Sequence, residues 1–447
     1  MYQIDSSIYE AQDLADLINH CEQFGNIPLF VSAERTVTFR QYCIHVKKIL
    51  TGLTCSENQI CILAIKDQVL LAEVWMAVAL SGRIACLLPD KHSIPDSLAG
   101  AFQINDEEAR RLLEASPLRN LPKQDSKAVC TIAFSSGTTS AAKGVMLSQR
   151  NLLLDTEYSL RYYRYYEGMR LVHILPYWHL FGLGADLLAL LHCGSSIYIP
   201  SEFHQIEALS LFNPHSINIA PAFADLLVSL LKNTDDIKKI TGSCLKRVVC
   251  GGAPFAQETE QALFHYGILP CSGYGLTECS PCVSITRGDD VHPGTSGVPL
   301  ECVKIRFSSE GEILVSGDTI MCGYYKDSRE TQKRIQNGWF HTGDLGYIDH
   351  AGNLVITGRL TNMIVLPSGK KCIPEEIESA LCRFPEIREC CLSMNKHRLT
   401  LDVVSILPAE RVKELTDTIM IKNGLIPYDL CVNEQGLKRN SMGKIIR

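Results

Sequence analysis

The chain has 447 residues, which at roughly 150 residues per domain allows about three lobes and a large buried core. Hydrophobic residues make up 46% of the sequence and charged residues 21%, so the composition excludes a disordered chain. The 43 basic and 49 acidic side chains give a net charge of −6, which argues against a nucleic-acid-binding surface. A local basic pocket for a small phosphate compound remains compatible with this balance.

The cysteines and the apolar stretches bear on the cellular compartment. The 19 cysteines are odd in number and irregularly spaced between Cys21 and Cys431, unlike those of a disulfide framework. This pattern favours a reducing compartment. The first residues are acidic where an export signal is basic, and the most apolar stretch, 69–80, is interrupted by Glu73. We therefore expect a cytoplasmic protein without an export signal or an integral membrane span.

Short apolar runs alternate with longer segments of helical periodicity over the first two thirds of the chain. This alternation predicts an α/β fold in which parallel sheets are covered by helices. The expected strands include 61–65, 129–134, 217–220 and 247–250, and the expected helices include 68–81 and 183–191.

The pattern changes twice toward the end of the chain. From about Ser296 short strands punctuated by glycine predict a smaller β-rich subdomain. In the last piece a helix is expected to begin at Pro374, because proline favours the first helical position and two glutamates follow it. We expect a large N-terminal domain, 1–359, and a small α+β C-terminal domain, 360–447.

The segment from Ser135 to Lys143 is the most specific feature of the sequence. It follows an expected buried strand and precedes a helix that Ser148 can cap, so hydroxyls, backbone N–H groups and an ammonium can converge on one anion. It is not a Walker loop, because Lys143 is preceded by Ala142 and followed by Gly144. Taken alone, the segment fits a Ser/Thr-rich surface loop better than a phosphate site.

Four further motifs follow this loop. They are 273–278 (GYGLTE), 339–346 (WFHTGDLG), 358–359 (GR) and 443–447 (GKIIR). Together with the loop, and from about Thr38 to the last residue, the sequence resembles the AMP-forming acyl-CoA synthetase, adenylation-domain and luciferase superfamily. The resemblance implies a ligase that uses ATP and Mg²⁺ to convert a carboxylic acid to an acyl-adenylate and then to a thioester.

The resemblance also implies a nucleotide site. Glu278 and Thr138 would coordinate Mg²⁺, a hard cation suited to oxygen ligands. Tyr274 would pack against adenine, and Asp344, assisted by Arg359, would accept hydrogen bonds from the ribose hydroxyls. Taken singly, Tyr274 and Asp344 would more often be a core aromatic and a turn aspartate. The remaining implied nucleotide-binding residues are Ser135, Ser136, Gly137, Thr139, Lys143, Gly252, Ala253, Gly275 and Thr277.

Lys444 is the implied catalytic lysine. Each repulsion between unit charges at about 4 Å costs roughly 1 kcal/mol in water and about 4 kcal/mol at an effective dielectric near 20, and a positioned ammonium offsets it as the acid approaches ATP. In the family the equivalent lysine then withdraws as the mobile C-terminal domain rotates and a thiol enters. The pivot is expected at 360–362, and 366–371 resembles the loop that lines the pantetheine tunnel.

Some positions depart from the family pattern. Ser140 stands where the second glycine of the phosphate loop is usual, and Ala142 where proline is usual, so the loop's backbone freedom differs. Thr361 and Asn362 replace a Lys-Asp pair of many relatives, which keeps a turn-forming side chain but removes its charge. The effect of these departures stays open.

The segment 175–183 matches the region that opens the acid pocket, with His179 and Trp178 as gate candidates. Amino-acid-activating relatives carry an aspartate where this chain has Phe181, so a free α-amino acid is disfavoured. The other expected wall segments carry no charge, which predicts an apolar pocket for a fatty or simple aryl acid and a role in fatty acid metabolism. These segments are 220–223, 250–254 and 272–273.

The acceptor thiol and the activity itself leave alternatives. CoA is the expected acceptor, and the phosphopantetheine of an acyl or peptidyl carrier protein is a second one that the short C-terminal domain allows. A non-catalytic adenylate-binding regulator is a third possibility, against which the retained Lys143, Glu278, Asp344 and Lys444 argue. Cys279 and Cys282 lack the four ligands of a structural zinc site and are expected to be small buried side chains.

Overall fold

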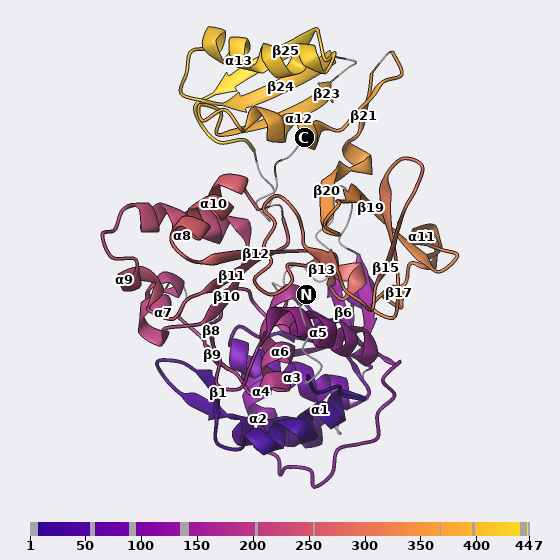
Figure 1. Cartoon of the computed structure of the whole chain (residues 1–447). Helices are drawn as coiled ribbons and strands as arrows, with labels where there is room; N and C mark the ends of the chain where they lie inside the picture. Colours follow the sequence, from indigo (N-terminus) through magenta and orange to yellow (C-terminus); the bar gives the residue numbers. More distant parts are fainter. Residues whose placement is uncertain are drawn as a thin grey trace.

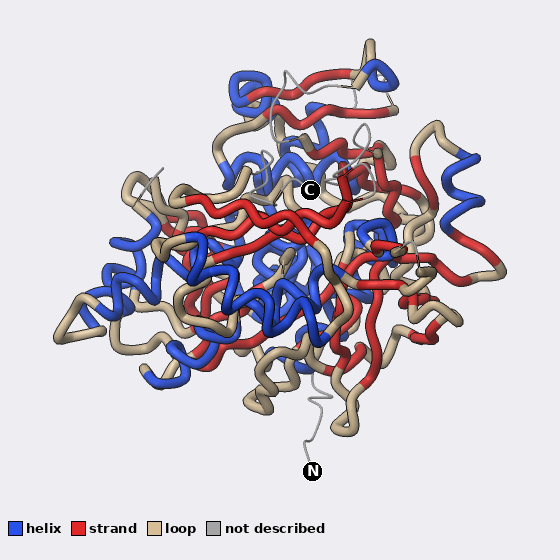
Figure 2. Tube along the Cα trace, turned by 90° about the horizontal axis from the view of Figure 1, so that it is seen from above, coloured by secondary structure: helices blue, strands red, loops and turns tan. Residues whose placement is uncertain are grey.

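The computed structural model describes residues 8–53, 59–88, 95–134, 143–201, 204–253, 255–366, 368–395, 398–438 and 445. In Figure 1 the chain runs from a large part, indigo to orange, to a smaller C-terminal part, yellow, that stands on top of it. Helices lie beside strands in every part of the described chain (Figure 2), so the α/β class predicted from the sequence is confirmed.

A mixed sheet of nine described strands forms one half of the large part. Its central strands are parallel, and the pairs at its two ends are antiparallel. The parallel pairing of the two strands 247–250 and 269–275 brings Cys250 level with Ser272, so their carboxyl ends open at one edge. In spatial order the strands are β14 (Val298–Pro299), β13 (Cys282–Ile285), β12 (Leu269–Gly275), β11 (Arg247–Cys250), β10 (Ser216–Ile219), β8 (Arg170–Val172), β9 (Ser196–Tyr198), β1 (Pro28–Val31) and β2 (Thr36–Thr38).

A second sheet has six strands in the described chain. Four of them are parallel, and the last two are antiparallel to their neighbours. In spatial order they are β5 (Phe102–Asn105), β3 (Ile60–Ala64), β4 (Ile84–Leu87), β6 (Val129–Phe134), β7 (Gly144–Ser148) and β17 (Gly323–Tyr324). Because β17 comes from much later in the chain, its pairing with β7 brings Tyr324 beside Val145.

Helices bury the apolar faces of both sheets. The predicted helix 68–81 is α3, in which every residue from Val69 to Leu80 is buried. Its Glu73 is held by the His45 ring, with 2.7 Å between Oε1 and Nδ1, which explains how a carboxylate fits this core. The other described helices of this part are α1 (Leu14–Cys21), α2 (Phe39–Leu53), α4 (Asp106–Leu112), α5 (Gln149–Tyr163), α6 (Ala189–Cys193), α7 (Gln205–Phe212), α8 (Pro221–Lys232), α9 (Lys238–Thr241) and α10 (Gln257–His265).

The connection after the predicted phosphate loop differs from the sequence expectation. Strand β7 stands between the loop and α5, and it pairs antiparallel with β6, with Phe134 opposite Gly144. Ser148 caps α5 as predicted, but it does so at the far end of this five-residue strand. Along the chain, β7 therefore separates Lys143 from the first residue of α5, because the run 144–148 pairs as a strand.

The β-rich subdomain contains five strands in the described chain, β15 (Lys304–Phe307), β16 (Glu312–Ser316), β18 (Ile335–Gln336), β19 (Trp339–Ile348) and β20 (Leu354–Arg359), and the helix α11 (Ser328–Arg334). Antiparallel pairing of β19 with β20 sets Asp344 opposite Arg359. Two motifs that are separate in the sequence thus meet by strand register.

The residues after Arg359 pack around their own hydrophobic cluster, which includes Leu381, Leu392, Leu401 and Met420. A 3₁₀ turn (Leu360–Asn362) leads into this part. Its described elements are β21 (Ile364–Val365), β22 (Lys371–Cys372), α12 (Pro374–Leu381), β23 (Glu389–Asn395), β24 (Arg398–Val404), α13 (Ala409–Lys422) and β25 (Tyr428–Asn433). The predicted helix start at Pro374 is confirmed. Within the described residues, no helix has the length and apolar character that crossing a bilayer requires.

Candidate active site

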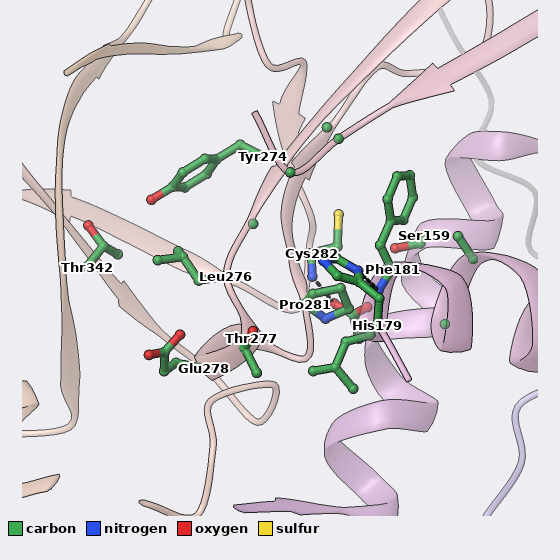
Figure 3. A pocket seen from close by; sticks show the side chains of 18 of the residues that line it. Ser159, His179, Phe181, Tyr274, Leu276, Thr277, Glu278, Pro281, Cys282 and Thr342 are labelled. Carbon is green, nitrogen blue, oxygen red and sulfur yellow. Dashed lines mark hydrogen bonds between the residues drawn. The ribbon is translucent and has the colours of Figure 1, made fainter. Parts of the chain in front are cut away.

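A cavity of about 280 Å³ lies where the nine-stranded sheet, α5 and the β-rich subdomain meet (Figure 3). Four of the sequence motifs reach it through their described residues. The residues that line it include Lys143, Asp155, Thr156, Ser159, Tyr163, His179, Phe181, Gly252, Tyr274, Gly275, Thr277, Glu278, Cys282, Tyr324, Arg334, Thr342, Asp344, Arg359 and Thr361.

The Tyr274, Asp344 and Arg359 side chains form a bonded group at one end. The Tyr274 hydroxyl donates to Asp344 Oδ2 at 2.7 Å, and Arg359 Nε lies 3.0 Å from Asp344 Oδ1. Burial, together with the Asp344 carboxylate, raises the pKa of Tyr274 well above its usual value, so the hydroxyl stays a donor. Each carboxylate oxygen has two lone pairs, which leaves Asp344 able to accept from a further hydroxyl.

The motif needs a glycine at position 275 because the backbone of another segment passes close to it. A Cβ at Gly275 would lie 1.9 Å from the Pro281 carbonyl oxygen, so the chain passes here only as glycine. The Leu276 amide then donates to that same carbonyl oxygen at 2.8 Å. This close pass fixes the next turn, Thr277–Cys279, and with it Glu278.

Glu278 lies beside Tyr324, which the sequence motifs did not include. The Tyr324 hydroxyl donates to Glu278 Oε1 at 2.8 Å, and burial followed by the Glu278 charge raises the pKa of Tyr324. No group of three or more His, Cys, Asp or Glu in the described residues could hold a metal ion. A Mg²⁺ at Glu278 would thus take most of its ligands from phosphate oxygens and water, as this ion commonly does.

Lys143 lies at the edge of the cavity and is paired. Its Nζ is 2.6 Å from Glu330 Oε1, and Arg334 Nε shares the same oxygen at 3.2 Å. The hydrogen bond from Lys143 is the main cause that holds the pKa of Glu330 below its usual value. The sequence did not predict that Glu330 and Arg334 lie at this site. Their i,i+4 spacing predicts a contact between them on one helix, but not the contact of Glu330 with Lys143, 187 residues away.

His179 lines the cavity as expected, and the Phe181 amide lies 3.2 Å from its Nδ1 (Figure 3). That amide is a donor, so Nδ1 accepts and the ring is oriented. Trp178, the second gate candidate, contacts His179 edge-on with 6.2 Å between ring centroids but does not line this cavity. The predicted helix 183–191 begins here as a π-helix, Gly182–Leu188, before α6.

The predicted apolar acid pocket is only partly correct. Apolar side chains such as Leu160 and Phe181 line it, but so do Asp155, Thr156 and Ser159 of α5. The predicted wall segment 220–223 lies at the start of α8, with Ala220 as the N-cap, and does not line the cavity. The α5 residues were missed because their helical spacing does not reveal which face of a buried helix meets a cavity.

Several predicted residues are not tested by this geometry. Ser135, Ser136, Gly137, Thr138, Thr139 and the catalytic candidate Lys444 lie outside the described residues. Ala253 is exposed and does not line the cavity, whereas its neighbour Gly252 does. Cys279 is buried as expected, and Cys282 is only partly buried because it faces the cavity.

A family model described as AMP-binding enzyme matches residues 83–325, more than half of the chain. The chain belongs to the AMP-binding enzyme family. Among its relatives, a long-chain-fatty-acid–CoA ligase from Bacillus subtilis is 27% identical over 381 residues, 81% of this chain and 67% of that protein. A 4-coumarate–CoA ligase from Humulus lupulus is 30% identical over 355 residues, 71% of this chain and 63% of that protein. The chain spans about half to two thirds of the length of the curated relatives it matches.

Solved structures share the fold of this AMP-binding enzyme. The o-succinylbenzoate CoA synthetase of Bacillus subtilis, in complex with its acyl-adenylate intermediate, superposes with a TM-score of 0.81 at 21% identity over 96% of both chains. The ATP-bound MatB of Rhodopseudomonas palustris gives a TM-score of 0.84 at 20% identity over 96% of this chain and 97% of that one. The fold class is thereby established for nearly the whole chain.

Proposed function

We propose that this protein is an AMP-forming acid–thiol ligase that activates a carboxylic acid with ATP and transfers the acyl group to CoA. The observation that carries the proposal is the cavity itself. Residues from 143 to 359 converge on it, with cations and hydroxyl-binding groups at one end and a partly apolar pocket at the other. Family membership and the CoA ligase relatives support the same reaction.

The reaction has two steps. A carboxylate oxygen of the acid attacks the α-phosphorus of ATP, which forms the acyl–O–P bond and releases pyrophosphate. The CoA thiolate then attacks the acyl carbon, which forms the thioester and releases AMP. The first step brings two anions together, so cations at the site lower its barrier.

The described residues suit the nucleotide in both charge and donor type. Asp344, with Tyr274 and Arg359 fixing its two oxygens, would accept from the ribose diol. Lys143 would exchange Glu330 for phosphate oxygens, and Glu278 offers a carboxylate for Mg²⁺, whose charge would offset that of the phosphates.

The second step requires that the catalytic lysine make room for the thiol. We assign the large domain to 1–359 and a mobile domain, which carries Lys444, to 360–447. The separate hydrophobic cluster of the C-terminal part and the 3₁₀ turn at its start support this division. Asn362 Nδ2 donates to Glu375 Oε1 at 2.6 Å across that turn, so the uncharged Asn362 still makes a side-chain contact there.

The lining of the far pocket supports the proposed substrate class. Leu160, Leu180 and Phe181 line the far pocket and would contact an apolar body, either a fatty chain or an aryl ring. We place the protein in the cytoplasm, in fatty or aryl acid metabolism, with CoA as acceptor. If CoA is not the acceptor, the test below would identify the phosphopantetheine of a carrier protein in its place.

A pyrophosphate-exchange screen over fatty, aryl and amino acids tests the first step. Release of AMP is then measured with CoA and, separately, with a pantetheinylated carrier protein. We expect exchange with a fatty or aryl acid and AMP release with CoA. AMP release with the carrier protein but not with CoA would identify the carrier protein as the acceptor. No exchange with any acid would reject the ligase in favour of an adenylate-binding protein.

Lys444→Ala separates the two steps. Exchange should fall by orders of magnitude, whereas thiolysis of a supplied acyl-adenylate should persist, because the lysine serves adenylation alone. Equal loss in both assays would reject the two-state assignment.

Glu278→Ala should raise the Mg²⁺ requirement, and an unchanged requirement would remove Glu278 from the metal site.

A further inference from the structure

One face of α5 presents polar side chains to the cavity. Asp155, Thr156 and Ser159 lie within one helical turn of each other, and all three are buried cavity-lining residues. In Figure 3 Ser159 stands across the pocket from Glu278 and Thr342, at the end remote from the residues we assign to the nucleotide. An acid whose carboxylate points toward the nucleotide would therefore direct its other end at this face.

Asp155 is a buried carboxyl group that accepts one hydrogen bond from the described residues, at its Oδ1. It is 2% exposed, and the Cys282 amide donates to its Oδ1 at 2.9 Å. No ion pair to Asp155 occurs in the part of the chain that the structure describes. Burial raises the pKa of Asp155 well above its usual value, against the opposing effect of the Cys282 amide.

The Thr156 hydroxyl is buried and has no hydrogen-bond partner among the described residues. A helical threonine can bond back to a carbonyl of the preceding turn, but this one does not. It lies against the cavity, and a Cβ placed on Gly184, another lining residue, would be 3.9 Å from its Oγ1. Buried polar groups are rarely left unpaired, so this hydroxyl is suited to a bound molecule.

We propose that the acid substrate carries a hydroxyl group at the end remote from its carboxylate, and that Asp155, Thr156 and Ser159 bind this hydroxyl. This inference rests on the proposed ligase function and adds the substrate class. A hydroxyl both donates and accepts, which matches a face made of one carboxyl and two hydroxyl groups. The apolar residues beside it fit the rest of such an acid.

An ammonium group fits this face less well. It would need the ionised form of Asp155, which burial disfavours, and the resulting pair would have to be desolvated on both sides. A purely apolar end fits less well still, because it would cover the Thr156 hydroxyl and the Asp155 carboxyl without bonding to either. The hydroxyl is the group that satisfies both.

Matched acids test the proposal. Pairs of aryl acids and of fatty acids that differ only by a terminal hydroxyl are compared by kcat/KM in pyrophosphate exchange. We expect the hydroxylated member of one pair to be favoured by about tenfold to a hundredfold, because a site built for a hydroxyl rejects an analogue without it. Equal rates, or a preference for the matched amino-substituted acid, would overturn the proposal.

Variants assign the preference to this face. Thr156→Val keeps the shape of the side chain and removes its hydroxyl, so the preference ratio should fall at least about fivefold. Asp155→Asn, which keeps an acceptor for the Cys282 amide, should also lower the ratio. Tyr158→Phe removes a hydroxyl from the same helix away from the cavity and should leave the ratio unchanged. Equal ratios in Thr156→Val and wild type would refute the assignment.

A binding measurement keeps this test separate from the ligase proposal. Uncleavable acyl-adenylate mimics with and without the hydroxyl are titrated calorimetrically into the full chain. We expect the hydroxylated mimic to bind at least about tenfold more tightly, and equal affinities would reject the hydroxyl site even where exchange is robust. Absence of exchange with every acid would instead reject the ligase, while the two affinities still decide this inference.

Discussion

The two ends of the cavity differ in how their polar groups are satisfied. At the end that we assign to the nucleotide, the charged groups have protein partners: Asp344 has Arg359, and Lys143 has Glu330. At the α5 end Asp155 has no cation among the described residues, and Thr156 has no hydrogen-bond partner there. Under the proposed function, the nucleotide would exchange existing pairs, whereas the acid would supply partners that the described residues lack.

This contrast has a physical basis. A polyanion binds strongly enough to displace carboxylates from Lys143 and Arg334, so prior pairing keeps the cations in place at a modest cost. Specificity for an acid arises more sharply from buried groups that only the right ligand satisfies. Substitutions at either end of the cavity test this difference.

The largest effect is expected for Asp344→Ala at the nucleotide end. Two hydrogen bonds to a carboxylate at roughly 1.5–3 kcal/mol each would be lost, so AMP affinity should fall by at least about a hundredfold. Calorimetric titration with AMP measures this, and Asp318→Ala, an exposed aspartate paired with Arg150, is the control. Unchanged affinity would remove Asp344 from the ribose site.

Asp155→Asn should change the pH dependence of stability. The pKa of Asp155 is raised in the folded chain, so the folded state binds its proton more tightly, and stability declines as pH rises from about 4 toward that raised pKa. The slope per group is at most about 1.4 kcal/mol per pH unit. Denaturant unfolding measured from pH 4 upward should show the free energy of unfolding of the variant rising relative to that of the wild type. Parallel plots of this free energy against pH would contradict the prediction.

Glu330→Gln should release Lys143 and Arg334 at the nucleotide end. A partly exposed ion pair is worth about 0.2–1 kcal/mol, so ATP should bind up to about fivefold more tightly once the cations are free. Equilibrium binding of ATP at two salt concentrations tests this prediction. Weaker binding would show instead that Glu330 positions Lys143 for the phosphates.

The smallest effect is expected for Tyr324→Phe. The Tyr324 hydroxyl occupies one lone pair of Glu278, and its loss should lower the Mg²⁺ requirement by no more than about threefold, because a carboxylate has several acceptor positions. A Mg²⁺ titration of pyrophosphate exchange measures the change. A higher requirement would mean that Tyr324 orients Glu278 toward the metal.

Much of the fold, and several of the residues that line the cavity, were predictable from local sequence patterns. The strands 129–134 and 247–250, the buried helix 68–81 and the helix start at Pro374 all follow from apolar periodicity or from capping chemistry. Tyr274, Glu278, Asp344 and Arg359 were found because their motifs are contiguous. Tyr324 and Glu330 were not, because each contacts a residue far away in the sequence, and Arg334 joins the site only through its helical neighbour Glu330.

The α/β class, the family and the residues that we propose for the nucleotide could be inferred from the sequence alone, since periodicity, turn chemistry and short motifs are local properties. Two features could be learned only from the folded chain: α5 presents Asp155, Thr156 and Ser159 to the cavity, and Glu330 holds Lys143. Most residues of α5 are buried, so its periodicity does not distinguish a packed face from a face that meets a cavity. That distinction depends on the packing of neighbouring elements, which strand order and register set.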